Sequence, residues 1–553
     1  MKRFCIFAVI AVLALQCSPR RPVGNEEIPG AAGEPVTLGV LKLMPESAVA
    51  AIAIPSVNRT YEQIETLLLR GAPADINMEA ELKVIVSQMA RLAGALEAST
   101  VEEIALDKGI ESQKPIGIFL GSASGETPSA QVQNEMLRQV GFSTVPPFAA
   151  VLPVASRQDA EKFVTEWGGS GTMDAVDLDT PATTIFTNTE KTFSYFFTDS
   201  QLVAGSDPAL VLGVAERMKG AGASIRYGTA ECPADGAYEI VQLIRTDKLP
   251  KDSNATMPGA VRNALPSGAA DAAAEAWSGW LGGYTGTDPM VITWKLDEDR
   301  ATVRARLDYT KHPEAQERLS EAKSLRHVTL VPKGTLGLYS LEITPRMREG
   351  MKELTAEMVG GGGGLVDQIN EAFGQLIDTA GGEATFAVLG PGNDFSNLAM
   401  FVEFTDGNAT RSLMKELGMA PLVAETYNNT EIYSLILPAP APIYYALPKN
   451  TLVVATSTDK VKTMIDAVES GKASSFAEAL NPPLDPSVPR RQVLVVTRAA
   501  VTEALLPALR ANGAIAGETA SAAERGLEKI RDARLTTEVV NNWQDTKLVI
   551  QLE

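Results

Sequence analysis

The sequence predicts an α+β fold built from two tandem copies of one unit, each a mostly antiparallel, curved sheet with helices packed on one face. Two observations lead to this prediction: short apolar runs bounded by turn residues recur along the chain, and the same order of strands and helices occurs twice. A chain of 553 residues is also too long for one hydrophobic core. We expect the first copy at 37–310, a polar connector at 311–327 and the second copy at 328–553.

The clearest repeat joins a buried strand to a capped helix. It reads "LVAGSDPALVLGVAERM" from Leu202 and "LVVATSTDKVKTMIDAV" from Leu452. In both copies an apolar run precedes Ser, Thr or Asp residues, which can accept hydrogen bonds from the free amides of a helix's first turn. Apolar residues three and four positions apart follow, and each helix is expected to end near a glycine, Gly220 or Gly471.

Other segments recur in the same order along both halves. They are a strand after a proline (from Met44 and Val331), the strands "KPIGIFLG" and "EATFAVLG", strand–turn–helix units (from Pro147 and Asn397), single strands (from Ala237 and Arg491) and final hairpins (from Val291 and Thr536). Apolar spacing, turns and caps are kept while charged and nucleophilic residues differ. The repeated feature is therefore a shape, which disfavours chemistry that needs matched residues in both copies.

The proline-led first strand, "KPIGIFLG", "VLPVASRQDAEKFV" and "LVAGSDPALV" together resemble an uncharacterised bacterial family of exported proteins, known as a domain of unknown function. The resemblance covers most of the chain after the leader and rests on pattern more than on invariant residues. It implies a cell-envelope protein and carries over no catalytic residue.

Residues 1–17 have the pattern of a signal peptide. Lys2 and Arg3 precede an apolar run from Phe4 to Leu15 that is too short to span a bilayer as a helix. The segment 18–36 is rich in Pro, Gly and polar residues, which is typical of a flexible tether. We therefore expect export from the cytoplasm.

Cys17 stands where bacterial lipoproteins carry their acylated cysteine. The three residues before it, Ala14, Leu15 and Gln16, depart from the usual lipoprotein pattern. Ordinary signal cleavage after Ala14 is the alternative, so the protein is expected to be lipid-anchored to a membrane or else periplasmic or secreted. Ser18 favours the outer membrane if the rule of enteric bacteria applies.

Charge and cysteine usage exclude several function classes. A net charge of −19 repels phosphate backbones and anionic lipids, so nucleic acid is not expected as a partner and membrane contact is expected only through the N-terminal lipid. Cys5 leaves with the signal peptide, and acylation of Cys17 would leave Cys232 alone. The fold is then expected to be stable without a disulfide.

Residues that commonly carry catalysis or bind metals do not form a recognisable set. His312 and His327, the two histidines of the chain, are interpreted as solvated connector residues. Zinc-ligand spacing is absent, and "VGGGGGL" lacks the Lys-Ser/Thr of a phosphate-binding loop. "STDK" at Ser457–Lys460 fits S-x-x-K, but we interpret it as a helix cap. We expect no catalytic residue, metal or cofactor.

One aromatic stripe is a candidate binding site. Trp277, Trp280 and Tyr284 lie at helical spacing and could stack on a ligand, although a stripe that faces the core has the same pattern.

Together these features predict an exported cell-envelope protein, a lipoprotein that acts as a non-enzymatic binding or scaffold protein. Its partner would be another protein or an apolar ligand. One alternative is a carrier that holds an apolar ligand or lipid in a cleft between sheet and helices. A less favoured alternative is a carboxylate-based hydrolase, which requires two carboxylates to converge in a cleft at about 5–10 Å.

Overall fold

The computed structural model describes residues 39–72, 77–121, 147–167, 173–177, 184–188, 192–220, 238–245, 290–308, 324–344, 348, 352, 374–390, 397–416, 422–435, 442–471, 476–480, 483–485, 487–505, 529–540 and 543–553. The chain divides into two compact units, Asn25–Gln316 and Glu317–Glu553. The division falls inside the segment predicted to be a connector.

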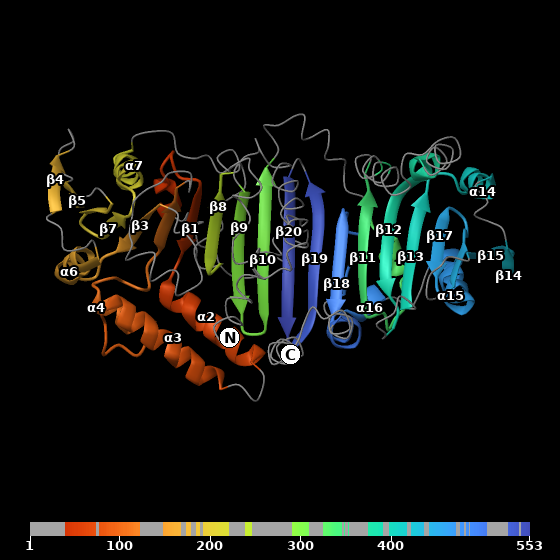
Figure 1. Ribbon diagram of the computed structural model, residues 1–553, viewed down its shortest axis with the longest axis horizontal. Helices are drawn as coiled ribbons and strands as arrows, with labels where there is room; N and C mark the ends of the chain where they lie inside the picture. The colour runs from red at the N-terminus through yellow and green to blue at the C-terminus, as the bar shows by residue number, and fades with distance from the viewer. Residues whose placement is uncertain are drawn as a thin grey trace, which may run out of the picture. The chain divides into compact units, whose positions relative to one another are not determined.

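The first unit contains an antiparallel sheet, shown in Figure 1. Its strands lie in the order β10-β9-β8-β1-β2-β3-β7-β6-β5-β4. They are β1 (Ala50–Ile54), β2 (Ile116–Leu120), β3 (Phe148–Pro153), β4 (Met173–Asp177), β5 (Thr184–Asn188), β6 (Ser194–Phe197), β7 (Gln201–Gly205), β8 (Ile240–Ile244), β9 (Met290–Asp297) and β10 (Arg300–Asp308).

The second unit contains an antiparallel sheet in the order β20-β19-β18-β11-β12-β13-β17-β16-β15-β14. Its strands are β11 (Gly337–Ile343), β12 (Ala380–Val388), β13 (Leu398–Phe404), β14 (Val423–Tyr427), β15 (Thr430–Leu435), β16 (Ile443–Ala446), β17 (Thr451–Ala455), β18 (Gln492–Thr497), β19 (Ile530–Val540) and β20 (Trp543–Leu552). The α+β class with antiparallel sheets is confirmed.

The two sheets have the same strand order, with β1 at the place of β11 and so on to β10 at the place of β20. Register agrees as well, because Ala149 pairs with Phe119 and Gly205, while Ala399 pairs with Ala387 and Ala455. Matching backbone bonds outside the strands link Val49 N to Leu120 O, and Leu336 N to Val388 O. These pairings define equivalent positions in the two units.

Helices of the first unit pack on both faces of its sheet, so the predicted single covered face is wrong. Along β7, Val203 belongs to a core with α7 (Pro208–Met218) and the 3-10 turn η1 (Gly39–Leu43). Its neighbour Leu202 points the opposite way, into a core with α6 (Arg157–Trp167). Alternate residues of a strand face opposite sides, and β7 is apolar on both, which calls for a cover on each.

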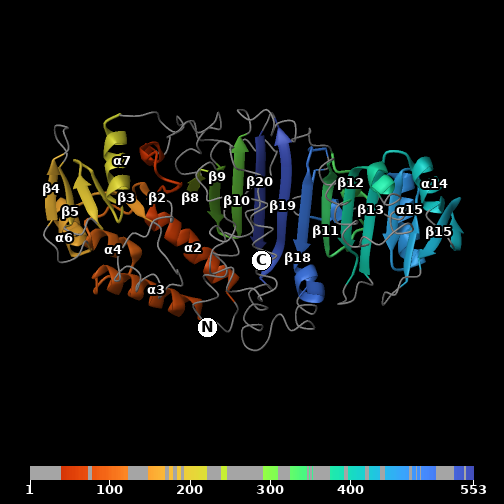
Figure 2. The same ribbon diagram turned by 45° about the horizontal axis from the view of Figure 1, so that its top comes forward.

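Three further helices form a group of their own in the first unit. They are α2 (Val57–Gly71), α3 (Met78–Ala93) and α4 (Val101–Asp107), which lie side by side in Figures 1 and 2. Buried apolar side chains join them, among them Val86, Ala90 and Ile104. Capping side chains begin all three, and α4 has a complete capping box between Thr100 and Glu103.

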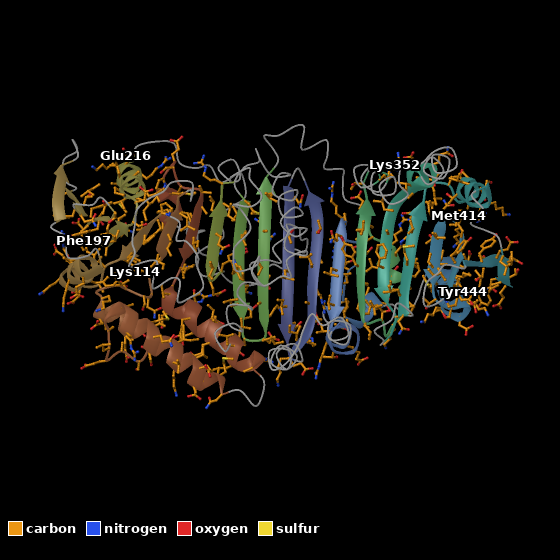
Figure 3. All side chains as sticks on the ribbon, in the orientation of Figure 1. Lys114, Phe197, Glu216, Lys352, Met414 and Tyr444 are labelled. Carbon is orange, nitrogen blue, oxygen red and sulfur yellow. The ribbon has the colours of Figure 1, made fainter. Side chains whose placement is uncertain are left out.

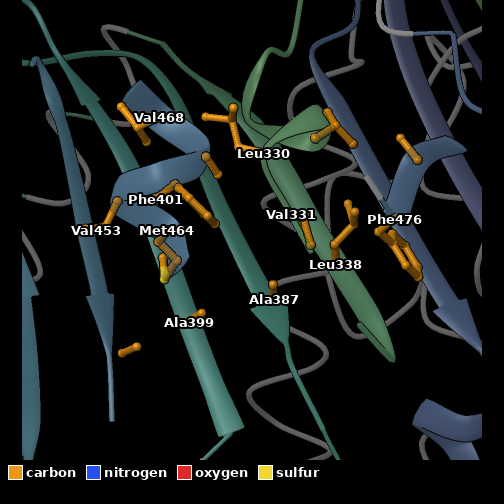
Figure 4. Close-up of a cluster of buried hydrophobic side chains, with 14 of the residues drawn as sticks. Leu330, Val331, Leu338, Ala387, Ala399, Phe401, Val453, Met464, Val468 and Phe476 are labelled. Atoms are coloured by element: carbon orange, nitrogen blue, oxygen red, sulfur yellow. The ribbon is translucent and has the colours of Figure 1, made fainter. Parts of the chain in front are cut away.

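The second unit is also covered on both faces. A large core joins Phe401 and Val453 of the sheet to Met464 of α15 (Thr458–Ser470), as Figure 4 shows. The 3-10 turn η3 (His327–Thr329) and α16 (Phe476–Ala479) belong to the same core, and the π-helical turn η5 (Ala500–Leu505) follows β18. On the opposite face Met414 of α14 (Gly407–Glu416), labelled in Figure 3, packs against Tyr433.

The predicted helix caps are confirmed in both units. Asp207 accepts a hydrogen bond from the Ala209 amide at the start of α7, and Ser457 accepts one from the Lys460 amide at the start of α15. Beyond these helices lie Gly220 and Gly471, whose positive φ angles of 77° and 65° suit glycine. No helix among the described residues is long and apolar enough to cross a membrane.

Candidate functional site

A cluster of buried polar side chains lies under η3 in the second unit. The carboxylate of Glu383 on β12 accepts a hydrogen bond from the hydroxyl of Ser340 at 2.5 Å and one from the hydroxyl of Thr385 at 3.1 Å. Its other oxygen accepts from the backbone N–H of His327 at 3.0 Å. Glu383 and Ser340 are 3% and 0% exposed, so the cluster is almost fully buried.

Strand register brings these side chains together. Ser340 on β11 lies directly opposite Thr385 on β12, and Glu342 lies directly opposite Glu383. Residues two apart on a strand share a face, so all four side chains are on one side of the sheet. They continue the row of the large apolar core that includes Leu338.

Burial governs the charge of Glu383 and His327. Loss of hydration raises the pKa of Glu383 from 4.5 to about 7, although the hydrogen bonds from Ser340, Thr385 and the chain at His327 and Arg326 act in the opposite direction. Loss of hydration lowers the pKa of His327 from 6.5 to about 4, against the attraction of Glu403. The Nδ1 of His327 is 4.0 Å from Glu383 and makes no hydrogen bond. The geometry is that of two neutral groups more than of an ion pair.

Two further acidic side chains lie near the cluster, Glu342 and Glu403. Glu342 lies beside the guanidinium of Arg491, with Oε2 and Nε 3.7 Å apart. Glu403 on β13 lies against Gly382, where a Cβ atom would meet its carboxylate oxygen at 1.9 Å. Gly382 has a φ of 104°, at an irregularity in the register of β12 with β13. A glycine is therefore needed immediately before Glu383.

The structure contradicts the prediction that His327 is a solvated connector residue. Its side chain is 4% exposed, and its ring lies 5.8 Å from that of Phe401. Leu325, which also falls within the predicted connector, is buried in the same core. The polar residues before this point suggested a linker, but the chain already packs on the sheet at Leu325.

The cluster can hold a proton but cannot present it to a substrate. Glu342 and Glu383 do face the same side of the sheet, as the hydrolase alternative requires, but they are only 5% and 3% exposed. General acid–base catalysis needs a group within hydrogen-bond reach of a substrate. Among the described residues no set of His, Cys, Asp and Glu side chains could hold a metal ion.

A second feature lies on the surface of the first unit. More than half of the exposed large apolar side chains among the described residues come from the stretch of α2, α3 and α4: Leu69 (43% exposed), Val84 (50%), Met89 (40%), Leu96 (77%) and Leu106 (63%). We name these five side chains the apolar helical surface. Exposed apolar side chains are typical of interaction sites where they form a contiguous patch.

Most of the residues proposed from the sequence lie outside the described residues. They are Cys17, Trp277, Trp280 and Tyr284, and the same holds for His312 and Cys232. Ser457 and Lys460 are described. The Ser457 hydroxyl caps α15, while Nζ of Lys460 is bonded to Asn397 at 2.9 Å, so the interpretation as a cap is confirmed.

Sequence reasoning missed Glu383 and the burial of His327. A signal was present in "GGEATFAVLG", where one carboxylate follows two glycines and comes directly before a mostly apolar run. A carboxylate at such a position is either at the surface or paired inside. Only its neighbours on β11, Ser340 and Glu342, decide between the two, and they are set by the register with β11.

Comparisons with known proteins give little beyond this geometry. No family model matches the chain, and none of the curated proteins matches it. Among solved structures, crystal form III of TP0453 aligns with 59% of this chain and 88% of its own, at 10% identity and a TM-score of 0.24. Crystal form I of TP0453 aligns with 51% and 81%, at 8% identity and a TM-score of 0.23. These scores are too low to establish a shared fold.

Proposed function

We propose that this protein is an exported cell-envelope lipoprotein that binds a partner protein or supports an assembly, without catalysis of its own. The observation that carries the proposal is the apolar helical surface of the first unit. Its most exposed members, Leu96 and Leu106, are 77% and 63% exposed. Exposure of such side chains is unfavourable in water, and binding of a partner removes that cost.

The same proposal includes the origin of the scaffold as a tandem duplication. Support comes from the identical strand order of the two sheets and from the equivalent register of β3 and β13 with their neighbours. Support also comes from the caps of α7 and α15, which follow equivalent strands. Membership of the uncharacterised family of exported proteins rests on the segments quoted above.

A protein is the proposed partner in preference to an anionic membrane. Acidic side chains stand among the members of the apolar helical surface, including Glu97, Glu102 and Asp107, and the whole chain carries a charge of −19. Such a surface repels anionic headgroups. Contact with a membrane is assigned to the lipid on Cys17.

The binding proposal is tested with a photo-crosslinking amino acid placed at Leu96 or Leu106 of the full chain in its own cells. Matched controls carry it at Leu398 or Leu422, which are exposed apolar positions of the second unit. We expect one adduct of discrete mass at the first pair of sites and none at the controls. Adducts of lipid mass would favour the apolar-ligand carrier, and equal adducts at all four sites would contradict a specific surface.

Export and anchoring are tested separately at Cys17. Labelling with an alkyne fatty acid should mark the wild-type protein in the membrane fraction, while Cys17→Ala should be unlabelled and soluble. A mature chain that begins at Leu15 and carries no label would contradict lipidation and support cleavage after Ala14.

A further inference from the structure

We propose that the buried pair Glu383 and His327 forms a latch that carries one proton in total and fixes η3 to the second sheet equally well across the mildly acidic pH range. The latch consists of these two residues with Ser340 and Thr385. It joins η3 to β11 and β12 of the second unit. Its role is to hold η3 against the sheet whatever the ambient pH.

Hydrogen bonds join η3 directly to the sheet. The His327 amide donates to Glu383, and the hydroxyls of Ser340 and Thr385, themselves 2.7 Å apart, lie within hydrogen-bond distance of the same carboxyl group from the sheet. Leu325 and Val328, on either side of His327, are buried in the core of the second unit. Opening of this turn would therefore expose both ionisable groups to water together.

Proton counting explains why the latch would not respond to pH. When η3 is closed, Glu383 has a pKa of about 7 and His327 one of about 4, so the pair holds one proton, on Glu383, at intermediate pH. When η3 is open, the values return to 4.5 and 6.5, and between these the pair again holds one proton, on His327. Stability depends on pH only where the two states bind different numbers of protons.

The charged groups around the latch do not break this balance. Glu342 on β11 lies beside Arg491, next to β18, with Oε2 and Nε 3.7 Å apart. Glu403 on β13 attracts a proton to His327, which moves its pKa upward without reversing the effect of burial. Arg326 precedes η3, and Glu478 on α16, the other element packed on the turn, is exposed. The burial of the pair itself is the dominant influence.

Removal of either partner should reveal a pH dependence that the pair hides. Glu383→Gln leaves His327 as the titrating partner. Its contribution to the stability of the closed turn is present above pH 6.5 and is lost as pH falls through about 4. His327→Val places in the second unit the residue that the first unit has at the equivalent position, Val40. This variant leaves Glu383 as the titrating partner. Its contribution to the stability of the closed turn is present below pH 4.5 and is lost as pH rises through about 7. The two slopes have opposite signs.

The measurement is hydrogen exchange of the full chain, followed in peptides that cover 325–330 and corrected for intrinsic exchange, at pH 5.0 and pH 6.5. Protection in wild type should change by less than about twofold. It should rise roughly tenfold with pH in Glu383→Gln and fall roughly tenfold in His327→Val, and the double variant should be flat again. Thr385→Val is the matched control, since it removes a hydrogen bond but keeps the proton and should lower protection alike at both pH values.

Slopes of the same sign in the two single variants, or a wild-type slope as steep as theirs, would overturn the proposal. A readout that needs no substitution is deuterium exchange at the C2 carbon of the imidazole ring, for which the chain has two histidines. His327 should remain neutral at pH 5.5. Titration of His327 near its ordinary pKa of 6.5 would contradict the latch.

Discussion

Beneath η1 in the first unit and beneath η3 in the second, equivalent positions are filled in opposite ways. Val40 stands five residues before Pro45, and His327 stands five residues before Pro332. Val40 fills the space over Gly117, where a Cβ atom would meet its Cγ2 at 2.4 Å. The position equivalent to Gly117 is Thr385, part of the polar cluster of Glu383 and His327.

The difference teaches that this backbone accepts either steric fit or hydrogen bonding at the same place. In the first unit the 3-10 turn is held by close apolar packing, which has no dependence on pH. The second unit uses polar groups, and an unmatched buried polar group would cost about 1–3 kcal/mol. Its packing is therefore directional and sensitive to the loss of a single partner.

The two units also differ in how each holds a buried glutamate. Glu239, just before β8, lies 2.9 Å from the guanidinium of Arg59 and accepts from the Leu296 amide at 2.7 Å. Glu383 is hydrogen-bonded to two hydroxyls and one amide, and it lies 4.0 Å from Nδ1 of His327. Burial raises the pKa of Glu383, which has no guanidinium at ion-pair distance among the described residues, whereas Glu239 has one at 2.9 Å.

The largest expected effect concerns the sheet beneath the two turns. Phe401 and Val151 occupy equivalent positions and are both fully buried. Phe401→Ala should lower the free energy of unfolding by about 3–5 kcal/mol, because a large cavity forms under the ring of His327. Val151→Ala should cost only about 2 kcal/mol, since it removes two methyl groups.

Urea-dependent hydrogen exchange separates the two units, because peptides from β13 and β3 report on each. Phe401→Leu serves as the matched control and should recover much of the loss. An equal loss of unfolding free energy in Val151→Ala and Phe401→Ala would show that the larger side chain gives the second unit no additional stability. That result would contradict the proposed difference between the two cores.

Much of this arrangement was predictable from the sequence. The strand–cap–helix pattern at Asp207 and Ser457 depends on neighbours within a few residues, so local chemistry was sufficient to place α7 and α15. The antiparallel order and the hairpins of β9–β10 and β19–β20 follow from short turns between apolar runs.

The candidate site was not predictable, because it depends on register. When "KPIGIFLG" and "EATFAVLG" are aligned by sequence, Gly117 corresponds to Phe386. The strand pairings of the two sheets show instead that Gly117 corresponds to Thr385. A slip of one residue moves every side chain to the other face of a sheet. The polar row at Thr385 and Glu383 was therefore not visible as a feature of one buried face, and neither was the cover that His327 provides.

A smaller effect tests steric fit in the first unit. Gly117→Thr introduces the residue of the second unit at the equivalent position and should cost about 1–3 kcal/mol, since its Cβ would displace Val40. The double variant Gly117→Thr with Val40→Ala should recover part of this loss. Peptides from β2 in the same exchange measurement give the result, and an unchanged stability of the single variant would contradict close packing at η1.

The smallest expected effect lies where the two units agree. Asp207→Ala and Ser457→Ala each remove a side chain that caps the first turn of a helix, α7 or α15. Each should lower the stability of its own helix by about 1 kcal/mol, seen as faster amide exchange in that helix alone. Asp207→Asn and Ser457→Thr keep a capping oxygen and should be close to wild type. Because equivalent helices begin in the same way, equal losses are expected, and a loss at only one helix would show that the units differ in more than the core beneath their first turns.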